Sequence, residues 1–140
     1  MNKEIILKSQ IETTISKRNS QNIKIAVFSM IQETIGKFDV ERSADIKTAL
    51  GEALENVVQH AYQSKKGRVE IYIKVYDDKS FDIKVRDFGC GIKNIKKARE
   101  PLFTTKEGRS GMGFVFMEAF SKNVTVESAP EEGTTVTLEF

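Results

Sequence analysis

Three polar side chains recur at one-turn intervals in the segment expected to be helical from Ser43 to about Gln63. Glu52, Asn56 and His60 are spaced i, i+4 and i+8, so on a helix they form a stripe along one edge of the apolar face. Asn56 could give Mg²⁺ a neutral oxygen ligand, and Glu52 could orient or deprotonate a nucleophile that attacks a terminal phosphate. The same stripe is typical of the polar edge of any amphipathic helix, on which His60 would be a packing or hydrogen-bonding residue. Phosphoryl chemistry therefore needs a phosphate site elsewhere in the chain.

The second candidate group is the string Asp87-Phe88-Gly89-Cys90-Gly91, which follows a run of strand-forming residues. Gly89 and Gly91 would let the backbone come close to a flat ligand. Asp87 could accept a hydrogen bond from an exocyclic amine such as that of adenine, a donor that guanine lacks, which would select adenine over guanine. A turn in which aspartate and glycine satisfy the backbone gives the same string.

A third group is rich in glycine and stands immediately before a predicted helix that begins near Phe114. Free backbone N–H groups at a helix start, together with the positive end of its dipole, suit a polyphosphate. The loop lacks the Lys-Ser/Thr ending of a Walker loop and the strand context of a dinucleotide fingerprint. The candidate donors are Ser110, Gly111, Met112 and Gly113.

The segment between the two glycine loops has the composition of a lid over phosphates. Thr104 and Thr105 supply hydroxyl groups, and Lys106 and Arg109 could neutralise phosphoryl charge. Each of the two basic residues could equally be a solvated loop charge.

The elements that must position these groups follow from hydrophobic periodicity. The expected fold is α/β (α+β): a two-layer sandwich of an antiparallel-rich mixed sheet with helices on one face, forming one domain over residues 1–140. A strand over residues 4–13 and a helix over 19–35 precede the helix that begins with Ser43 as its N-cap, on which Glu55 should face solvent. The remaining elements are a hairpin over 68–85, a short helix over 94–99, a helix over 114–120 and a second hairpin that turns near 130–133.

The net charge, the cysteine count and the hydropathy of the chain limit the class of protein. A formal net charge of +2 disfavours direct nucleic-acid binding as the main activity. The single cysteine, Cys90, excludes an internal disulfide, which is consistent with a reducing compartment. Neither a signal peptide nor an apolar run of membrane-spanning length is apparent, so a cytoplasmic protein without membrane contact is expected.

In combination, the order and spacing of the three motifs resemble the GHKL ATPase superfamily, which has the Bergerat ATP-binding fold. Within it the chain is most similar to the bacterial anti-sigma factor serine kinases, especially the sporulation type that acts on sigma F. The resemblance rests on four segments, Glu52–Tyr62, Val85–Ile92, Pro101–Lys106 and Arg109–Phe114.

The resemblance implies ATP and Mg²⁺ as ligands and a role for each motif. Glu52 would be the general base, Asn56 the Mg²⁺ ligand and Asp87 the acceptor of the adenine amino group, with Gly89 and Gly91 closing around the base. The lid would comprise Thr104, Thr105 and Lys106, and backbone donors would come from residues 110–113.

The resemblance also implies partners. A homodimer would sequester the sigma factor and phosphorylate a serine of an anti-anti-sigma partner, which would add charge and favour release. Alternatives are a general-stress anti-sigma kinase, or a nucleotide-dependent sigma-binding module with little kinase activity. The segment between Lys106 and Arg109 is shorter than in the sporulation type, and Lys24 stands where an arginine is expected; lysine cannot reproduce a bidentate guanidinium contact.

Overall fold

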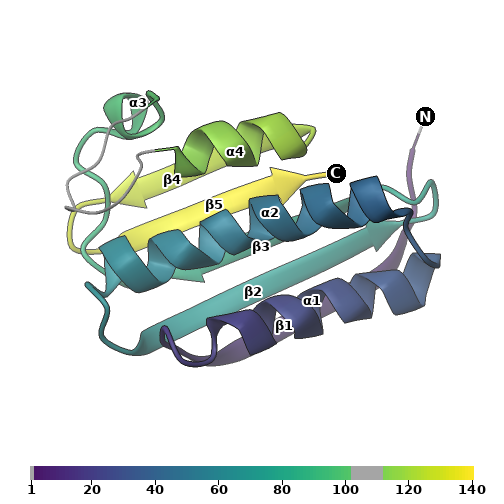
Figure 1. The fold of residues 1–140 in the computed structure, drawn as a ribbon, viewed down its shortest axis with the longest axis horizontal. Coiled ribbons are helices and arrows are strands. Elements are labelled where there is room, and N and C mark those ends of the chain that lie inside the picture. Colours follow the sequence, from purple (N-terminus) through teal and green to yellow (C-terminus); the bar gives the residue numbers. More distant parts are fainter. Residues whose placement is uncertain (1, 102–111) are drawn as a thin grey trace.

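The computed structural model describes residues 2–101 and 112–140, which form two layers (Figure 1). One layer is a five-stranded sheet of order β1-β2-β3-β5-β4, and every pairing in it is antiparallel. The other layer contains α1, α2 and α4, which lie against the same face of the sheet. The predicted sandwich is thereby confirmed, without a parallel pair between the described strands. The strands are β1 (Ile5–Ile15), β2 (Gly67–Tyr76), β3 (Phe81–Asp87), β4 (Asn123–Ala129) and β5 (Gly133–Glu139).

The predicted central hairpin is present as β2 and β3. Its register pairs Val75 with Phe81 and Val69 with Asp87, so Asp87 is the last residue of β3 and lies beside the start of β2. Alternate residues of β3 are buried under the helices while Lys84 and Arg86 face outward, as the period of two requires. The hairpin therefore places Asp87 at one end of the sheet and Phe81 at the other.

The long helices are α1 (Ser20–Ile35) and α2 (Val40–Asn56). The prediction of Ser43 as the N-cap of α2 is wrong, because Asp39 caps the helix and accepts a hydrogen bond from the Arg42 N–H at 2.7 Å. The expectation of a continuous α-helix to Gln63 is also wrong. The α-helix ends at Asn56 and continues as a π-helical segment, η1 (Val57–Ala61).

The shorter helices are α3 (Ile95–Ala98), which Asn94 caps, and α4 (Gly113–Phe120). Figure 1 shows α4 beside α2 over the β4–β5 side of the sheet, with α3 at the end where β3 finishes. Among the described residues, no helix is both long and apolar enough to cross a membrane.

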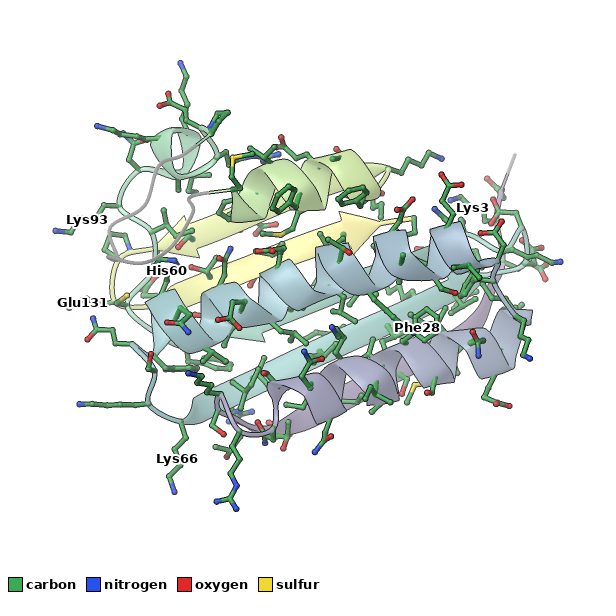
Figure 2. All side chains as sticks on the ribbon, viewed as in Figure 1. Lys3, Phe28, His60, Lys66, Lys93 and Glu131 are labelled. Atoms are coloured by element: carbon green, nitrogen blue, oxygen red, sulfur yellow. The ribbon has the colours of Figure 1, made fainter. Side chains whose placement is uncertain are left out.

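The core fills the space between the two layers. Leu50 and Leu54 of α2 meet Ile71, Ile73 and Ile83 of the sheet, and all five side chains are almost fully buried. Burial of each such side chain contributes about 1.5–3 kcal/mol. In Figure 2 side chains fill this layer, while His60, Lys93 and Glu131 lie at one end of the molecule and Lys3 at the other. The rigid core thus supports the end that carries Asp87.

Candidate functional site

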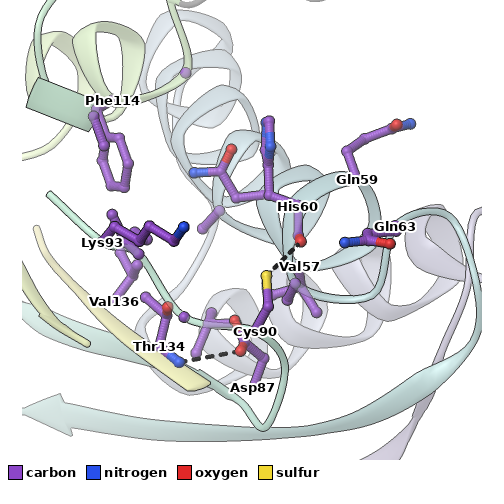
Figure 3. A pocket seen from close by; sticks show the side chains of 18 of the residues that line it. Val57, Gln59, His60, Gln63, Asp87, Cys90, Lys93, Phe114, Thr134 and Val136 are labelled. Carbon is purple, nitrogen blue, oxygen red and sulfur yellow. Dashed lines mark hydrogen bonds between the residues drawn. The ribbon is translucent and has the colours of Figure 1, made fainter. Parts of the chain in front are cut away.

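A cavity of about 690 Å³ lies at the end of the sheet where β3 finishes (Figure 3). Ligand cavities in proteins usually measure about 300–1,000 Å³. Its walls come from the end of α2, from η1, from the segment after β3, from the start of α4 and from β5. Among the lining residues are Ala53, Asn56, Val57, His60, Asp87, Gly91, Ile92, Lys93, Phe114, Thr134 and Val136. Most of this wall is apolar, so a flat aromatic ligand could bury its faces there.

Asp87 is the buried acidic group of the cavity wall, with 5% of its surface exposed. Its Oδ1 accepts the backbone N–H groups of Gly89 at 3.0 Å and Thr134 at 3.1 Å. Burial raises the pKa of the Asp87 carboxyl above its ordinary value, and these two hydrogen bonds lower it in part. Both donors reach Oδ1 and neither reaches Oδ2. The arrangement therefore suits a ligand that donates a hydrogen bond, as the exocyclic amine of adenine does.

Gly89 and Gly91, in the segment that follows Asp87, pack against different parts of the chain. A Cβ atom on Gly89 would lie 2.3 Å from the Ala61 carbonyl oxygen, and one on Gly91 would lie 2.1 Å from the Ala129 carbonyl oxygen. Gly91 also has a φ of +76° and lines the cavity. Both glycines let this segment pack against its neighbours, and only Gly91 contributes to the cavity wall.

Glu52 and Asn56 lie one turn apart on α2 and both approach the first residue of α4. A Cβ atom on Gly113 would lie 3.2 Å from Glu52 Oε2 and 3.4 Å from Asn56 Oδ1. The polar stripe thus meets the start of α4, where backbone N–H groups have no partner within the helix. Met112 precedes this helix as its N-cap. A carboxylate, an amide oxygen and a helix start are thereby brought together, and of these residues Asn56 and Gly113 line the cavity.

His60 departs from the predicted stripe, and Glu55 departs from its predicted exposure to solvent. Because a π turn holds more residues than an α turn, η1 changes the angular position of His60 relative to Asn56. His60 lines the cavity, and its carbonyl oxygen accepts the Cys90 thiol at 3.2 Å. Glu55 is half-buried rather than solvated, since Gln59 donates to its Oε1 at 2.9 Å.

Six predicted site residues lie outside the described part of the chain. They are Thr104, Thr105, Lys106, Arg109, Ser110 and Gly111. Gly113, which follows them in the chain, is described and lines the cavity.

Sequence reasoning missed Thr134. This threonine is buried, lines the cavity and donates its N–H to Asp87. Its hydroxyl lies 2.8 Å from that of Ser128, which accepts the Ile92 N–H at 2.8 Å. In the sequence, Thr134 stands among other strand threonines, so only the pairing of β3 with β5 reveals its position.

No group of three or more histidine, cysteine, aspartate or glutamate side chains gathers among the described residues. Mg²⁺ commonly takes only one or two protein oxygens and fills its other positions with water and phosphate. The Asn56 amide oxygen beside Glu52 fits that pattern of donors.

Comparison with known proteins shows the family. A sequence profile of the Histidine kinase-like ATPase domain matches residues 22–140. The chain is 46% identical over 101 residues to the anti-sigma F factor of Caldanaerobacter subterraneus subsp. tengcongensis, covering 71% of this chain and 70% of that protein. It is 37% identical over 131 residues to the anti-sigma F factor of Bacillus subtilis strain 168, covering 91% of this chain and 88% of that protein.

Solved structures show the same fold at low identity. The SiaB-SiaC complex from Pseudomonas aeruginosa contains a chain with a TM-score of 0.67 and 12% identity, covering 97% of this chain and 89% of that chain. The structure of RsbU and RsbW domains from Mycobacterium tuberculosis matches with a TM-score of 0.62 and 20% identity, covering 94% of this chain and 32% of that chain. With the fold, the cavity and these sequence matches in agreement, the chain belongs to the histidine kinase-like ATPase domains and, within them, to the anti-sigma F factor family.

Proposed function

We propose that this protein is an anti-sigma factor that binds ATP in the cavity and acts as a protein serine kinase. Asp87 accepts a hydrogen bond from the amino group of adenine. The faces of the adenine ring lie against the apolar wall of the cavity. The phosphates extend toward Gly113 and the start of α4, where the helix dipole favours negative charge. The single observation that carries the proposal is the approach of Glu52 and Asn56 to Gly113, where Asn56 and Gly113 line the cavity that also contains buried Asp87.

In the proposed reaction, Glu52 is the general base that accepts the proton of the attacking serine hydroxyl. Asn56 holds Mg²⁺ through its amide oxygen. The ion, when bound, neutralises charge on the phosphates. In this proposal Thr104, Thr105 and Lys106 form the lid over the phosphates, Arg109 neutralises phosphoryl charge, and the backbone of residues 110–113 donates to the phosphates.

The proposed partners follow from the names of the relatives. Anti-sigma F factors as similar as 46% over most of the chain support a sigma F-like factor as the sequestered partner. The phosphate acceptor is a serine of an anti-anti-sigma protein, and the kinase acts as a cytoplasmic homodimer. Phosphorylation adds charge to the acceptor surface and releases it, whereas unphosphorylated acceptor displaces the sigma factor.

The experiment that tests the proposal is transfer of labelled γ-phosphate from ATP·Mg²⁺ to a purified anti-anti-sigma protein. Wild type is compared with Glu52→Gln, and Glu55→Gln serves as the matched control because it alters the other carboxylate of the same helix turn. Loss of the base should lower transfer by about 100-fold or more while ATP binding stays within about twofold. Glu55→Gln should transfer phosphate at nearly the wild-type rate.

A pull-down of sigma F and of a general-stress sigma factor runs in parallel. Retention of sigma F by both wild type and Glu52→Gln supports sequestration that does not depend on catalysis. Binding of ATP and sigma factor without transfer to any acceptor would contradict the kinase and leave a sequestering module. Retention of the general-stress factor alone would contradict the sporulation partner.

A further inference from the structure

The turn that carries Asp87 is attached to the end of η1 by three hydrogen bonds. The Phe88 N–H donates to the Tyr62 hydroxyl oxygen at 2.8 Å. The Cys90 N–H donates to the Ala61 carbonyl at 3.3 Å, and the Cys90 thiol donates to the His60 carbonyl at 3.2 Å (Figure 3). Of the three acceptors, only the Tyr62 hydroxyl belongs to a side chain, and it bonds the residue next to Asp87.

Tyr62 is itself held at both ends of its side chain. Its hydroxyl donates to the Arg68 carbonyl at the start of β2. Its ring covers Gly67 so closely that a Cβ atom there would lie 2.5 Å from the ring carbons. Burial is the main cause that raises the pKa of the Tyr62 phenol, so the hydroxyl stays protonated and can donate to Arg68 while it accepts from Phe88. The phenol therefore links η1, the β2 start and the Asp87 turn.

The side chain of Phe88 is fixed separately from its backbone. The guanidinium groups of Arg68 and Arg86 lie 5.1 Å and 4.7 Å from the centre of its ring. Glu70, which is 6% exposed, accepts hydrogen bonds from Arg68 and from the Tyr72 hydroxyl. The two guanidinium groups thus hold the Phe88 ring, whereas the Tyr62 hydroxyl holds the N–H of the peptide between Asp87 and Phe88.

From these contacts we infer that Tyr62 is a positioning residue for adenine recognition: its hydroxyl holds the Asp87–Phe88 peptide so that the carboxylate faces the base. Tyr62 does not line the cavity, so it acts through Asp87 and not on the nucleotide itself. The inference rests on the proposed function in one respect, namely that an adenine nucleotide binds beside Asp87. It adds a residue that determines specificity without touching the ligand.

The test compares Tyr62→Phe with Tyr76→Phe. The first variant keeps the ring over Gly67 and removes only the hydroxyl. Tyr76 is the matched control, because its hydroxyl also bonds a protein group, Asp82 at 2.8 Å, but at the opposite end of β2. Dissociation constants of ATP·Mg²⁺ and GTP·Mg²⁺ are measured by calorimetry well below the melting temperature of each variant.

Tyr62→Phe removes the hydroxyl's bonds to Phe88 and Arg68 and should weaken ATP binding by about 3- to 10-fold, because the bond to Phe88 is the one that orients the Asp87 carboxylate. GTP lacks the amino donor that Asp87 recognises, so its binding should change less than twofold and the preference for ATP should fall. In the nucleotide-free variant, the Phe88 amide should exchange its hydrogen at least about 5-fold faster, while the Ile83 amide in mid-strand keeps its rate. Tyr76→Phe should retain the wild-type preference for ATP and the wild-type Phe88 exchange rate.

An unchanged ATP preference in Tyr62→Phe, or an unchanged Phe88 exchange rate, would overturn the positioning role even if the kinase proposal stands. The kinase proposal can also fail by itself. If wild type binds ATP but transfers no phosphate, the kinase activity is contradicted, and the ratio of the ATP and GTP dissociation constants in Tyr62→Phe still tests the role of Tyr62. Wild type that binds neither nucleotide overturns both proposals.

Discussion

Strand β3 begins and ends in buried residues of opposite kinds. At its start, the Phe81 ring is fully buried, with its centre 5.9 Å from that of Phe38 and 5.0 Å from that of Phe140. At its end, the carboxylate of Asp87 is buried beside a cavity, where burial raises its pKa. Both residues belong to one regular strand of seven residues, so the backbone is the same and the side chains make the difference.

The same contrast runs along α2. Its start lies near the aromatic rings, with the Arg42 guanidinium 6.0 Å from the Phe81 ring centre and 5.8 Å from that of Phe140. Its end carries Asn56 and gives way to η1 at the cavity. Packing at the aromatic end stabilises the fold, whereas the cavity end gives up packing for polar groups that can meet a ligand. Substitutions at the two ends should therefore affect stability and nucleotide binding in different proportions.

The largest expected effect on stability is at the aromatic end. Phe81→Ala removes a fully buried ring that contacts two others, and it should lower the free energy of unfolding by about 3–5 kcal/mol. Urea denaturation measures this loss. ATP affinity of the fraction that remains folded should stay within about twofold of wild type. A large loss of affinity in the folded protein would show that the two ends are coupled.

At the cavity end, Gly91→Ala should cost about 2–3 kcal/mol. Its φ of +76° alone accounts for about 1–2 kcal/mol, and the new Cβ atom would meet the Ala129 carbonyl oxygen at 2.1 Å. Gly36→Ala is the matched control, since Gly36 has a φ of +96° and nothing within 4 Å of the added atom. Denaturation curves should show Gly91→Ala to be the more damaging change, and only this variant should lose ATP affinity. Equal losses of unfolding free energy in the two variants would mean that the β4–β5 hairpin shifts to make room for the added Cβ atom.

Periodicity in the sequence was sufficient to predict the hairpin that delivers Asp87, because strict alternation in both strands fixes which side chains face the core. It did not reveal η1. The carbonyl groups of His60 and Ala61 in η1 accept hydrogen bonds from Cys90, about thirty residues further along the chain, and a local pattern does not contain such contacts. Long-range pairing likewise hides Thr134, whose N–H reaches Asp87 only when β5 joins β3.

The start of α2 was predicted wrongly for a local reason. Apolar periodicity begins at Ile46, and this start predicts Ser43 as the N-cap. In the structure Asp39 caps the helix one turn earlier, and the first helical residue, Val40, is exposed. Asp39→Ala should therefore lower stability by about 1 kcal/mol, and Ser43→Ala should be neutral or slightly stabilising because alanine favours helix interiors. Thermal unfolding of the two variants distinguishes the caps. The reverse ranking would restore Ser43 as the cap.

The smallest expected change in stability is at Asp87, and its sign is opposite to the others. Because the folded-state pKa of Asp87 is raised, the ionised carboxylate opposes folding at neutral pH; this cost starts to shrink as the pH falls through the folded-state pKa and is gone below the pKa of the unfolded chain. Asp87→Asn keeps an oxygen that can accept from Gly89 and Thr134 and removes the charge. Its unfolding free energy should equal or slightly exceed that of wild type at pH 7, and the difference should vanish below the ordinary aspartate pKa of about 3.9.

Asparagine at position 87 would nevertheless weaken ATP binding strongly, since with Oδ1 engaged by the two backbone N–H groups its remaining group is a donor that faces the amine of adenine. Stability measured across pH together with ATP affinity therefore tests whether this end of β3 gives up stability for recognition. A variant that lost stability at neutral pH would show that the charge of Asp87 itself holds the turn. The cavity end would then be stabilised by its polar groups just as the aromatic end is stabilised by its rings.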